Sequence, residues 1–283
     1  AITNNTIIDT VATGGGGIGI FLGALEATSG YGTCRDNLVQ YNTIDASASA
    51  EAYSCPAICL SLDLRYNGYL AVNGSEDISG NQILDNNITA SAANNLVGIE
   101  VGTILGNNEE DPIRDDPDEI AAVMTAAAVH DNTVQDNSVD GADIGIYFYN
   151  ATNLTIIQNT IENNVGNGMY AEHGQNGTVI TGNTFTNNEI QLADETDDTE
   201  TLDPLDIVSI LNNNTLDRAV TVDHPGASLL HTIWSSIQDA IDEAEPGDTI
   251  DVAVGTYTES LTINDKGLTI TGESESGVIV QAG

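Results

Sequence analysis

The hydrophobic positions of this chain recur in short runs of three to five residues, separated by Asn and Gly. The clearest copies fill residues 144–192, where two successive lines align at a spacing of 23 positions. Gly145 is matched by Gly168 in this way, and Asn153 is matched by Asn176. A repeat of this length, made of apolar runs that are too short for helices, is typical of a solenoid.

The composition of the runs indicates β-strands. They are rich in Ile, Val, Thr, Tyr and Phe, which suit a pleated surface, and Asn and Gly between them suit sharp corners. Equivalent residues would stack about 4.8 Å apart, with Asn side chains bonded as a ladder. The sequence therefore predicts an all-β solenoid, a parallel β-helix. Inward-facing side chains, or their immediate neighbours, are expected at Ile146, Ile156, Ile161, Val179 and Phe185.

Copies of the repeat continue up to residue 216, with gaps longer than one coil. We expect insertions to loop out at residues 46–53, 66–77, 107–119 and 194–206, the last two of which are strongly acidic. Residues 1–216 therefore form a predicted parallel β-helix with acidic loop insertions.

After residue 216 the pattern changes. An apolar helical face is formed by Ile233, Trp234, Ile237, Ile241 and Ala244, which predicts one amphipathic capping helix near the C-terminus, over residues 232–244. Alternating strand-like runs follow it. Residues 217–283 are therefore expected to hold the capping helix and the start of a second β-helix segment.

The last segment also carries a family resemblance. The stretches 236–241, 247–250, 255–259 and 268–272 (SIQDAI, GDTI, GTYTE and LTITG) closely resemble the opening of pectin-lyase-like right-handed β-helix proteins. That group includes periplasmic copper-maturation β-helix proteins and many archaeal surface proteins. The resemblance implies a right-handed β-helix and an extracytoplasmic, carbohydrate-linked setting, but it implies no activity.

The order of the segments differs from that family, in which the amphipathic helix plugs the first coil. Three explanations are open: a permuted chain, a fragment of a tandem array, or a subunit whose two open ends complete each other. The third predicts a head-to-tail homopolymer, because an open β-helix edge is a template for association. Its expected subunit contacts are Ile2, Ile7, Ile8, Val278, Ile279 and Val280.

The charge of the chain excludes some partners. It has 43 acidic and 5 basic residues, a formal net charge of -38, and Lys266 is the only lysine. Such a surface repels nucleic acid and anionic membranes, and no apolar stretch is long enough for membrane insertion. The bias resembles that of proteins from halophilic organisms, whose carboxylates are screened by concentrated salt. We expect an extracellular or cell-surface location.

Candidate modifications follow from two residue types. Glycosylation sequons occur at Asn4, Asn73, Asn87, Asn150, Asn153, Asn176 and Asn213. The three cysteines, Cys34, Cys55 and Cys59, are either buried small side chains or hold one disulfide from Cys34 to Cys55 or Cys59.

Motifs for catalysis and cofactors are sparse. The hydrolase Gly-His-Gly motif is only approached at Glu172-His173-Gly174, and no catalytic residue is assigned. No cofactor is expected, with calcium as the one alternative, held by Asp194, Glu195, Asp197 and Asp198.

Three function classes remain open. The first is a structural subunit of a surface layer or filament. The second is a carbohydrate-active enzyme, a lyase, hydrolase or epimerase, in which Tyr147, Tyr149 and Tyr170 stack on sugars. The third is an adhesin module that binds glycans or calcium. The missing catalytic motifs favour the first over an enzyme.

Overall fold

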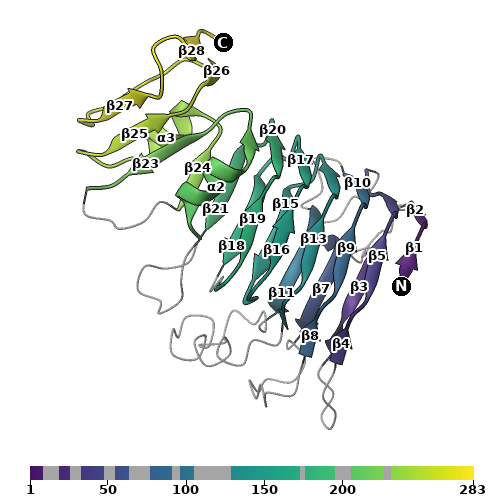
Figure 1. Ribbon diagram of the computed structural model, residues 1–283. Coiled ribbons are helices and arrows are strands. Elements are labelled where there is room, and N and C mark those ends of the chain that lie inside the picture. Colours follow the sequence, from purple (N-terminus) through teal and green to yellow (C-terminus); the bar gives the residue numbers. More distant parts are fainter. Residues whose placement is uncertain are drawn as a thin grey trace, which may run out of the picture.

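The computed structural model describes residues 1–8, 19–25, 33–47, 55–63, 77–90, 96–104, 129–172, 176–194, 205–225 and 231–283. The expected insertions lie largely outside these residues. The described strands stack in parallel, coil upon coil, along one axis (Figure 1). The predicted right-handed parallel β-helix is thus confirmed. None of the described helices has the length and apolar character needed to cross a membrane.

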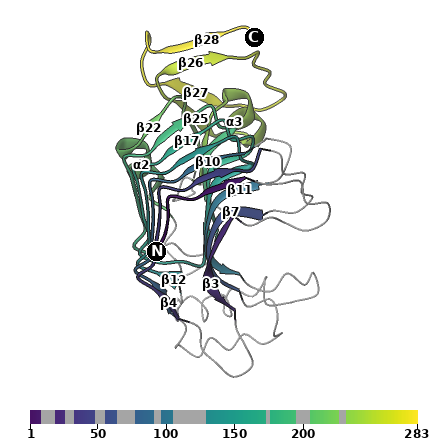
Figure 2. The same ribbon diagram turned by 90° about the vertical axis from the view of Figure 1, so that its right-hand side faces the viewer.

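Three long sheets form the faces of the solenoid, and Figure 2 looks along the stack. The first sheet contains β1 (Ile2–Thr3), β5 (Leu38–Gln40), β9 (Gln82–Leu84), β13 (Thr133–Gln135), β16 (Thr155–Ile157) and β19 (Val179–Thr181). The second contains β2 (Thr6–Ile8), β6 (Thr43–Asp45), β10 (Asn87–Thr89), β14 (Ser138–Asp140), β17 (Thr160–Glu162), β20 (Thr184–Thr186) and β22 (Thr215–Leu216).

The third sheet has the longest strands and runs through the whole molecule. It contains β3 (Ile20–Leu25), β7 (Cys55–Asp63), β11 (Leu96–Ile104), β15 (Ile144–Tyr149), β18 (Asn167–Glu172), β21 (Ile190–Asp194), β24 (Thr232–Trp234), β23 (Val220–Asp223), β25 (Thr249–Val252) and β27 (Thr269–Gly272). Two smaller sheets pair β4 (Thr33–Arg35), β8 (Asp77–Ser79) and β12 (Val129–His130), and β26 (Gly255–Thr258) with β28 (Val278–Gln281).

Along each strand, alternate side chains point inward and fill the interior of the solenoid. Ile146, Ile156, Ile161 and Phe185 are fully buried, as expected. Val179 is 50% exposed, however, and its neighbour Ile180 is buried. Ile156 pairs with Ile180, so on this strand the inward-facing residue is the immediate neighbour of Val179 that the sequence analysis left open.

The corners combine a left-handed residue with a buried asparagine. Gln158 (φ 58°) and Gly182 (φ 69°) each precede a ladder residue. The Asn159 side-chain amide donates to Asn183 Oδ1 across 2.9 Å, and the next rung joins Asn183 to Asn214. The full ladder comprises Asn5, Asn42, Asn86, Asn137, Asn159, Asn183 and Asn214. It ensures that buried turn amides have hydrogen-bond partners.

A short helix that the sequence analysis missed ends this ladder. In α2 (Ile207–Asn213), Asp206 caps the N-terminus, and Ile207 and Ile210 are buried. Asn214 Nδ2 donates to the Ile210 carbonyl across 2.8 Å, so the helix supplies an acceptor at the last rung.

The capping helix α3 (Ile237–Glu243) is shorter than expected, because Thr232–Trp234 forms strand β24 instead. Ser236 is the N-cap residue. The Glu259 carboxylate accepts hydrogen bonds from Ser236 Oγ and from the backbone N–H groups of residues 237 and 238. Lys266 donates to the carbonyls of residues 241 and 242 at the other end. Opposite charges therefore hold both helix termini.

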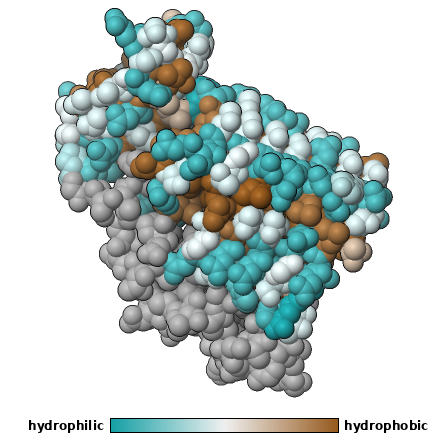
Figure 3. Space-filling model, viewed as in Figure 1, coloured by the Kyte–Doolittle hydropathy of each residue, from teal (hydrophilic) through white to brown (hydrophobic). Residues whose placement is uncertain are grey.

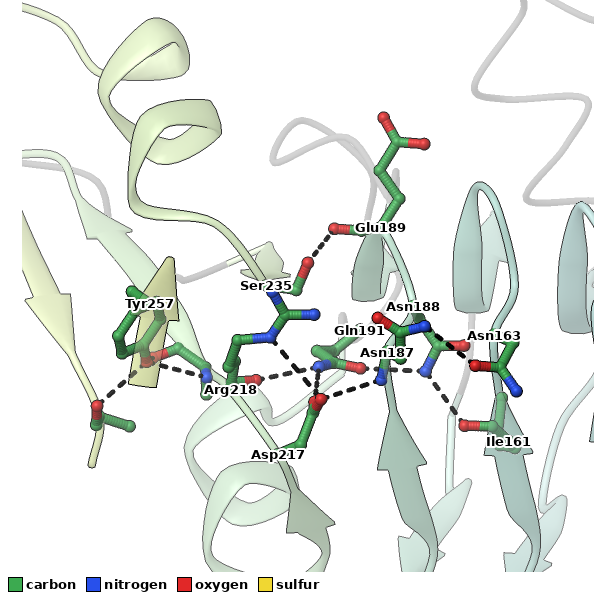
Figure 4. A network of polar contacts seen from close by, with 12 residues as sticks. Ile161, Asn163, Asn187, Asn188, Glu189, Gln191, Asp217, Arg218, Ser235 and Tyr257 are labelled. Carbon is green, nitrogen blue, oxygen red and sulfur yellow. Dashed lines mark hydrogen bonds and ion pairs between the residues drawn. The ribbon is translucent and has the colours of Figure 1, made fainter. Parts of the chain in front are cut away.

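The two ends of the molecule have separate cores that meet at an antiparallel junction. Strand β24 runs antiparallel to β21, and β23 runs antiparallel to β25. Around the junction, Asp217 accepts hydrogen bonds from the Asn187 backbone and from Gln191 Nε2 (Figure 4). Asn188 donates to Gln191 Oε1 across 3.0 Å, which links this network to the coils before it.

Candidate functional site

The outer face of the third sheet gathers aromatic and acidic side chains from three successive coils. Glu100 on β11 lies beside Tyr147 on β15, which lies beside Tyr170 on β18. One step along the strands, Tyr149 lies beside Glu172. Because alternate strand residues point to opposite faces, all five side chains share the outer surface. We call them the tyrosine–carboxylate face.

The phenol groups of this face bind its carboxylates. Tyr149 OH donates to Glu100 Oε1 across 2.7 Å. Tyr147 OH donates to Glu172 Oε2 across 2.6 Å, and Tyr170 OH donates to Glu172 Oε1 across 3.1 Å. Each carboxylate is thereby oriented by a neighbouring coil, as charge-assisted hydrogen bonds require.

The tyrosine rings also contact one another. The ring centroids of Tyr147 and Tyr149 lie 4.6 Å apart, and those of Tyr147 and Tyr170 lie 5.4 Å apart. Both pairs are tilted, within the range of favourable aromatic contacts. Tyr147 therefore lies at the centre of a continuous aromatic surface.

The face has a buried base and a more open part. Glu100 and Tyr149 are 7% exposed, and Cys59, which pairs with Glu100 from the adjacent strand β7, is 2% exposed, with its thiol 3.8 Å from Glu100 Oε1. Tyr170 and Glu172 are only half-buried. The open part is therefore the part that a ligand can reach.

Burial and negative charge keep these phenols protonated. Burial, and then the charge of Glu100, raises the pKa of Tyr149 well above its ordinary value. Burial and the charge of Glu172 act in the same way on the pKa of Tyr147. Tyr147 and Tyr149 therefore stay protonated at neutral pH and donate to the carboxylates beside them.

The sequence pointed to the tyrosines of this face but not to its acids. Glu100 reaches it through a strand register that spans the 107–119 insertion. Glu172 lies beside Tyr149 at the 23-residue spacing of the repeat, so for this residue the repeat itself was the available signal.

The acidic cluster expected to bind calcium is described only at Asp194, since Glu195, Asp197 and Asp198 lie outside the described residues. Asp194 is buried, and its carboxylate accepts a hydrogen bond from the Leu205 backbone across 2.8 Å. This hydrogen bond joins the two residues that flank the 195–204 insertion.

Of the two alternatives for the cysteines, the disulfide from Cys34 is not formed. The Cys34 thiol is half-buried without a disulfide, and Asn37 Nδ2 donates to it across 3.3 Å. Cys59 Sγ lies 3.3 Å from Ser61 Oγ as a thiol. The side chain of Cys55 lies outside the described residues.

The sequons differ in their exposure. Asn150 is buried, which makes it inaccessible in the folded chain, and Asn73 lies outside the described residues. The exposed sequon residues are Asn4, Asn87, Asn153, Asn176 and Asn213.

Another region with polar side chains is a cleft of about 620 Å³ at the junction, between α2 and the β25–β26 turn. Asp251 and Glu273 are its acidic residues, and Glu273 already accepts a hydrogen bond from the Val254 backbone. Of the two regions, the tyrosine–carboxylate face has the denser set of oriented polar groups.

A protein-family model matches this chain. The family model of NosD, described as periplasmic copper-binding protein, matches residues 61–203, half of the chain. No curated protein and no solved structure matches the chain. A periplasmic family fits the expected location outside the cytoplasm, while the cell-surface position stays a prediction.

The family description overturns one expectation. We expected no cofactor, with calcium as the alternative, whereas the matching family is described as copper-binding. The sequence analysis missed this because it assigned metal ligands from clustered carboxylates, whereas copper favours sulfur and imidazole ligands.

The described part of the chain does not fit such a centre. It contains no group of three His, Cys, Asp or Glu side chains that could hold a metal ion. His130 is 2.7 Å from Asp131, and Asp77 beside it pairs with Arg35. The parallel stack and the family match over half of its length together place this chain in the NosD periplasmic copper-binding family.

Proposed function

We propose that this chain is an extracytoplasmic β-helix protein that binds glycan chains on its tyrosine–carboxylate face. The observation that carries the proposal is the contact of Tyr147 with both Tyr149 and Tyr170, beside two oriented carboxylates. Aromatic rings offer flat apolar surface to the C–H faces of sugar rings, and carboxylates accept hydrogen bonds from their hydroxyl groups.

The burial pattern supports a division of roles. Tyr147, Tyr170 and Glu172 are half-buried and would contact the sugar. Tyr149 and Glu100 are buried and hold the others in place through ring contact and hydrogen bonding. Such a supported arrangement lowers the entropy lost on binding.

Affinity electrophoresis tests the proposal. The full chain is run in native gels that contain neutral, amine-bearing or uronate polysaccharides, beside the double variant Tyr147→Ala/Tyr170→Ala. Retardation of the wild type by at least one polysaccharide, and its loss in the variant, is expected.

Tyr41→Asn is the matched control. Tyr41 is 54% exposed at a corner between the first two sheets, and asparagine tolerates its φ of 57°. This variant should migrate like the wild type. If the wild type and the double variant migrate alike in every gel, the proposal is wrong.

A second proposal concerns self-association of copies of this chain, head to tail. Ile8 is 64% exposed on β2, and Ile279 and Val280 are 50% and 47% exposed on β28, while Ile2, Ile7 and Val278 are half-buried. These apolar side chains lie on edge strands, which favour pairing with a further coil.

Light scattering of the chain at rising concentration and salt tests this second proposal. Ile279→Lys should reduce association, whereas Val254→Lys, at an equally exposed position in a turn, should not. A wild type that stays monomeric throughout would refute it.

A further inference from the structure

We infer that the cleft where the two cores meet binds a small aliphatic molecule that carries a protonated amino group, and that Thr221 and Asp251 hold this group. The cleft has a volume of about 620 Å³ and lies between α2 and the β25–β26 turn. This volume is within the range of small-molecule sites. Its lining shares no residue with the tyrosine–carboxylate face, so the inference is independent of the proposed glycan binding.

One wall of the cleft is a row of three polar side chains on neighbouring strands. Thr221 on β23 pairs with Asp251 on β25, which pairs with Thr271 on β27. The residues that flank Thr221 and Asp251 along their strands belong to the C-terminal core, so alternation points the row away from that core. The row therefore presents two hydroxyl groups and a carboxylate to the cleft.

Thr221 is the member of the row that points to a ligand. The residue is only 6% exposed, yet none of the described residues forms a hydrogen bond with its hydroxyl group. A buried hydroxyl group without a partner costs free energy. A ligand group that enters the cleft and bonds to this hydroxyl would remove that cost.

The carboxylates of the cleft indicate the chemistry of this ligand group. Within the described part of the chain, no hydrogen bond or ion pair engages the Asp251 carboxylate. Glu273 accepts one hydrogen bond, from the Val254 backbone across 3.0 Å, and retains further acceptor capacity. A primary ammonium group has three N–H donors and a positive charge, which match hydroxyl and carboxylate oxygens. A ligand carboxylate would meet charges of its own sign.

The remaining lining suits an aliphatic body. Leu211 on α2, Leu216 on β22 and Val254 in the β25–β26 turn contribute apolar surface to the cleft. Val254 is 50% exposed, so a ligand can cover it. Contact with these side chains would remove apolar surface of both molecules from water. The ligand therefore combines an ammonium group with an alkyl chain.

Ligand-observed NMR titration of the full chain with hexylamine, hexan-1-ol and hexanoate tests the inference. The three compounds share one alkyl chain and differ in the head group, and the amine is protonated at pH 7, like a lysine side chain. We expect hexylammonium to bind about fivefold or more tightly than hexanol, because its charge pairs with the Asp251 carboxylate. Hexanoate should bind more weakly than hexanol.

Substitutions locate the binding. Asp251→Asn should weaken hexylammonium binding about fivefold or more and abolish its advantage over hexanol. Thr221→Val removes the hydroxyl group and should weaken hexylammonium binding about threefold. Asp265→Asn removes the same charge as Asp251→Asn at an exposed position outside the lining, and should leave all three affinities unchanged. Circular dichroism checks that each variant is folded.

Several outcomes would overturn the inference. Equal affinity for hexylammonium and hexanol would show that the carboxylates do not select the ligand. An equal loss in Asp251→Asn and Asp265→Asn would reduce the binding to general attraction by an acidic chain. No binding of hexylammonium, or an unchanged affinity in Thr221→Val, would also contradict it. The polysaccharide gels use other residues, so the glycan proposal would stand in each case.

Discussion

Asn137 Nδ2 donates to Asn159 Oδ1 across 3.0 Å, and the Asn137 backbone N–H donates to the same oxygen at the same distance. Both side chains are 1% exposed. The Asn159 side-chain oxygen therefore accepts hydrogen bonds from both the side chain and the backbone of Asn137 in the preceding coil. The coils are joined inside their corners as well as along their strands.

Replacing a ladder residue should therefore be costly. Asn159→Ala removes donors to the carbonyls of Val134 and Ile157 and the acceptor of Asn137. Buried groups left without partners cost about 1–3 kcal/mol each, so we expect a loss of about 2–4 kcal/mol of unfolding free energy. Urea denaturation measures it, with the exposed neighbour Thr160→Ala as control. A loss no larger than that of the control would contradict the structural role of the ladder.

Two adjacent residues of β19, one pointing inward and one outward, give a paired prediction. Ile180 is 6% exposed and Val179 is 50% exposed. Ile180→Ala should cost about 2–4 kcal/mol, because it leaves a cavity, while Val179→Ala should cost less than about 1 kcal/mol. Equal losses in denaturant titrations would mean that the register of this strand is different.

The carboxylate at the start of α3 should stabilise the second core. Glu259→Ala removes the acceptor of the N–H groups of residues 237 and 238. A lost helix cap costs about 1–2 kcal/mol, and we expect a fall of this size in unfolding free energy. Glu275→Ala, in an exposed turn, is the control and should be neutral. The prediction fails if both variants behave alike.

Acid should weaken the contact between β4 and β8. Burial by itself raises the pKa of Asp77, but hydrogen bonds from Ser79 and Arg35, with the charges of Arg35 and His130, bring it below the ordinary value of 3.8. A depressed folded-state pKa contributes stability above the unfolded-state pKa, and this stability is lost as pH falls through the folded pKa.

Asp77→Asn should consequently destabilise the chain at pH 7 and much less at pH 3. Urea titrations at both pH values test this, with Asp265→Asn as an exposed carboxylate for comparison. A pH-independent loss for Asp77→Asn would show that its charge is not involved.

Added salt should raise the melting temperature. Repulsion among 43 acidic residues with only 5 basic ones opposes the compact state, and salt screens it. Thermal melts monitored by circular dichroism should shift upward from dilute buffer to molar KCl, and NaCl should act similarly. A flat profile would show that the surface carboxylates are already balanced.

The sequence was informative where a residue's role is local. Asn and Gly at the corners and β-formers between them predicted the solenoid, since left-handed corners and pleated strands depend on nearby residues. It was less informative where the partner is distant. The placing of Ile180, the strand Thr232–Trp234 and the meeting of Tyr147 with Glu172 all depend on register between coils.

Helix α2 shows a different limit. The signals were present, with Asp206 before Ile207 and Ile210 one turn later, but seven residues beside an acidic insertion give a weak pattern. Its stability comes mainly from packing on the coil below, which no local pattern reports.

The composition of the exposed surface also could not be predicted from the alternation pattern. Figure 3 shows a mostly hydrophilic face crossed by a band of hydrophobic residues over the solenoid. Val179 and Val208 are among the large hydrophobic side chains that the structure exposes. Alternation predicts that one side of a strand is solvated, but it does not predict which residue type occupies that side.

The antiparallel meeting of β21 and β24 has a consequence for how such a chain can change in length. Each coil of the first solenoid contacts its neighbours above and below, so duplicating or losing a coil away from the junction would leave both cores intact. Every such event would move the two ends by about 4.8 Å, the spacing between strands. Evolutionary gain or loss of coils can therefore change the length of the first solenoid while its junction with the second core is preserved.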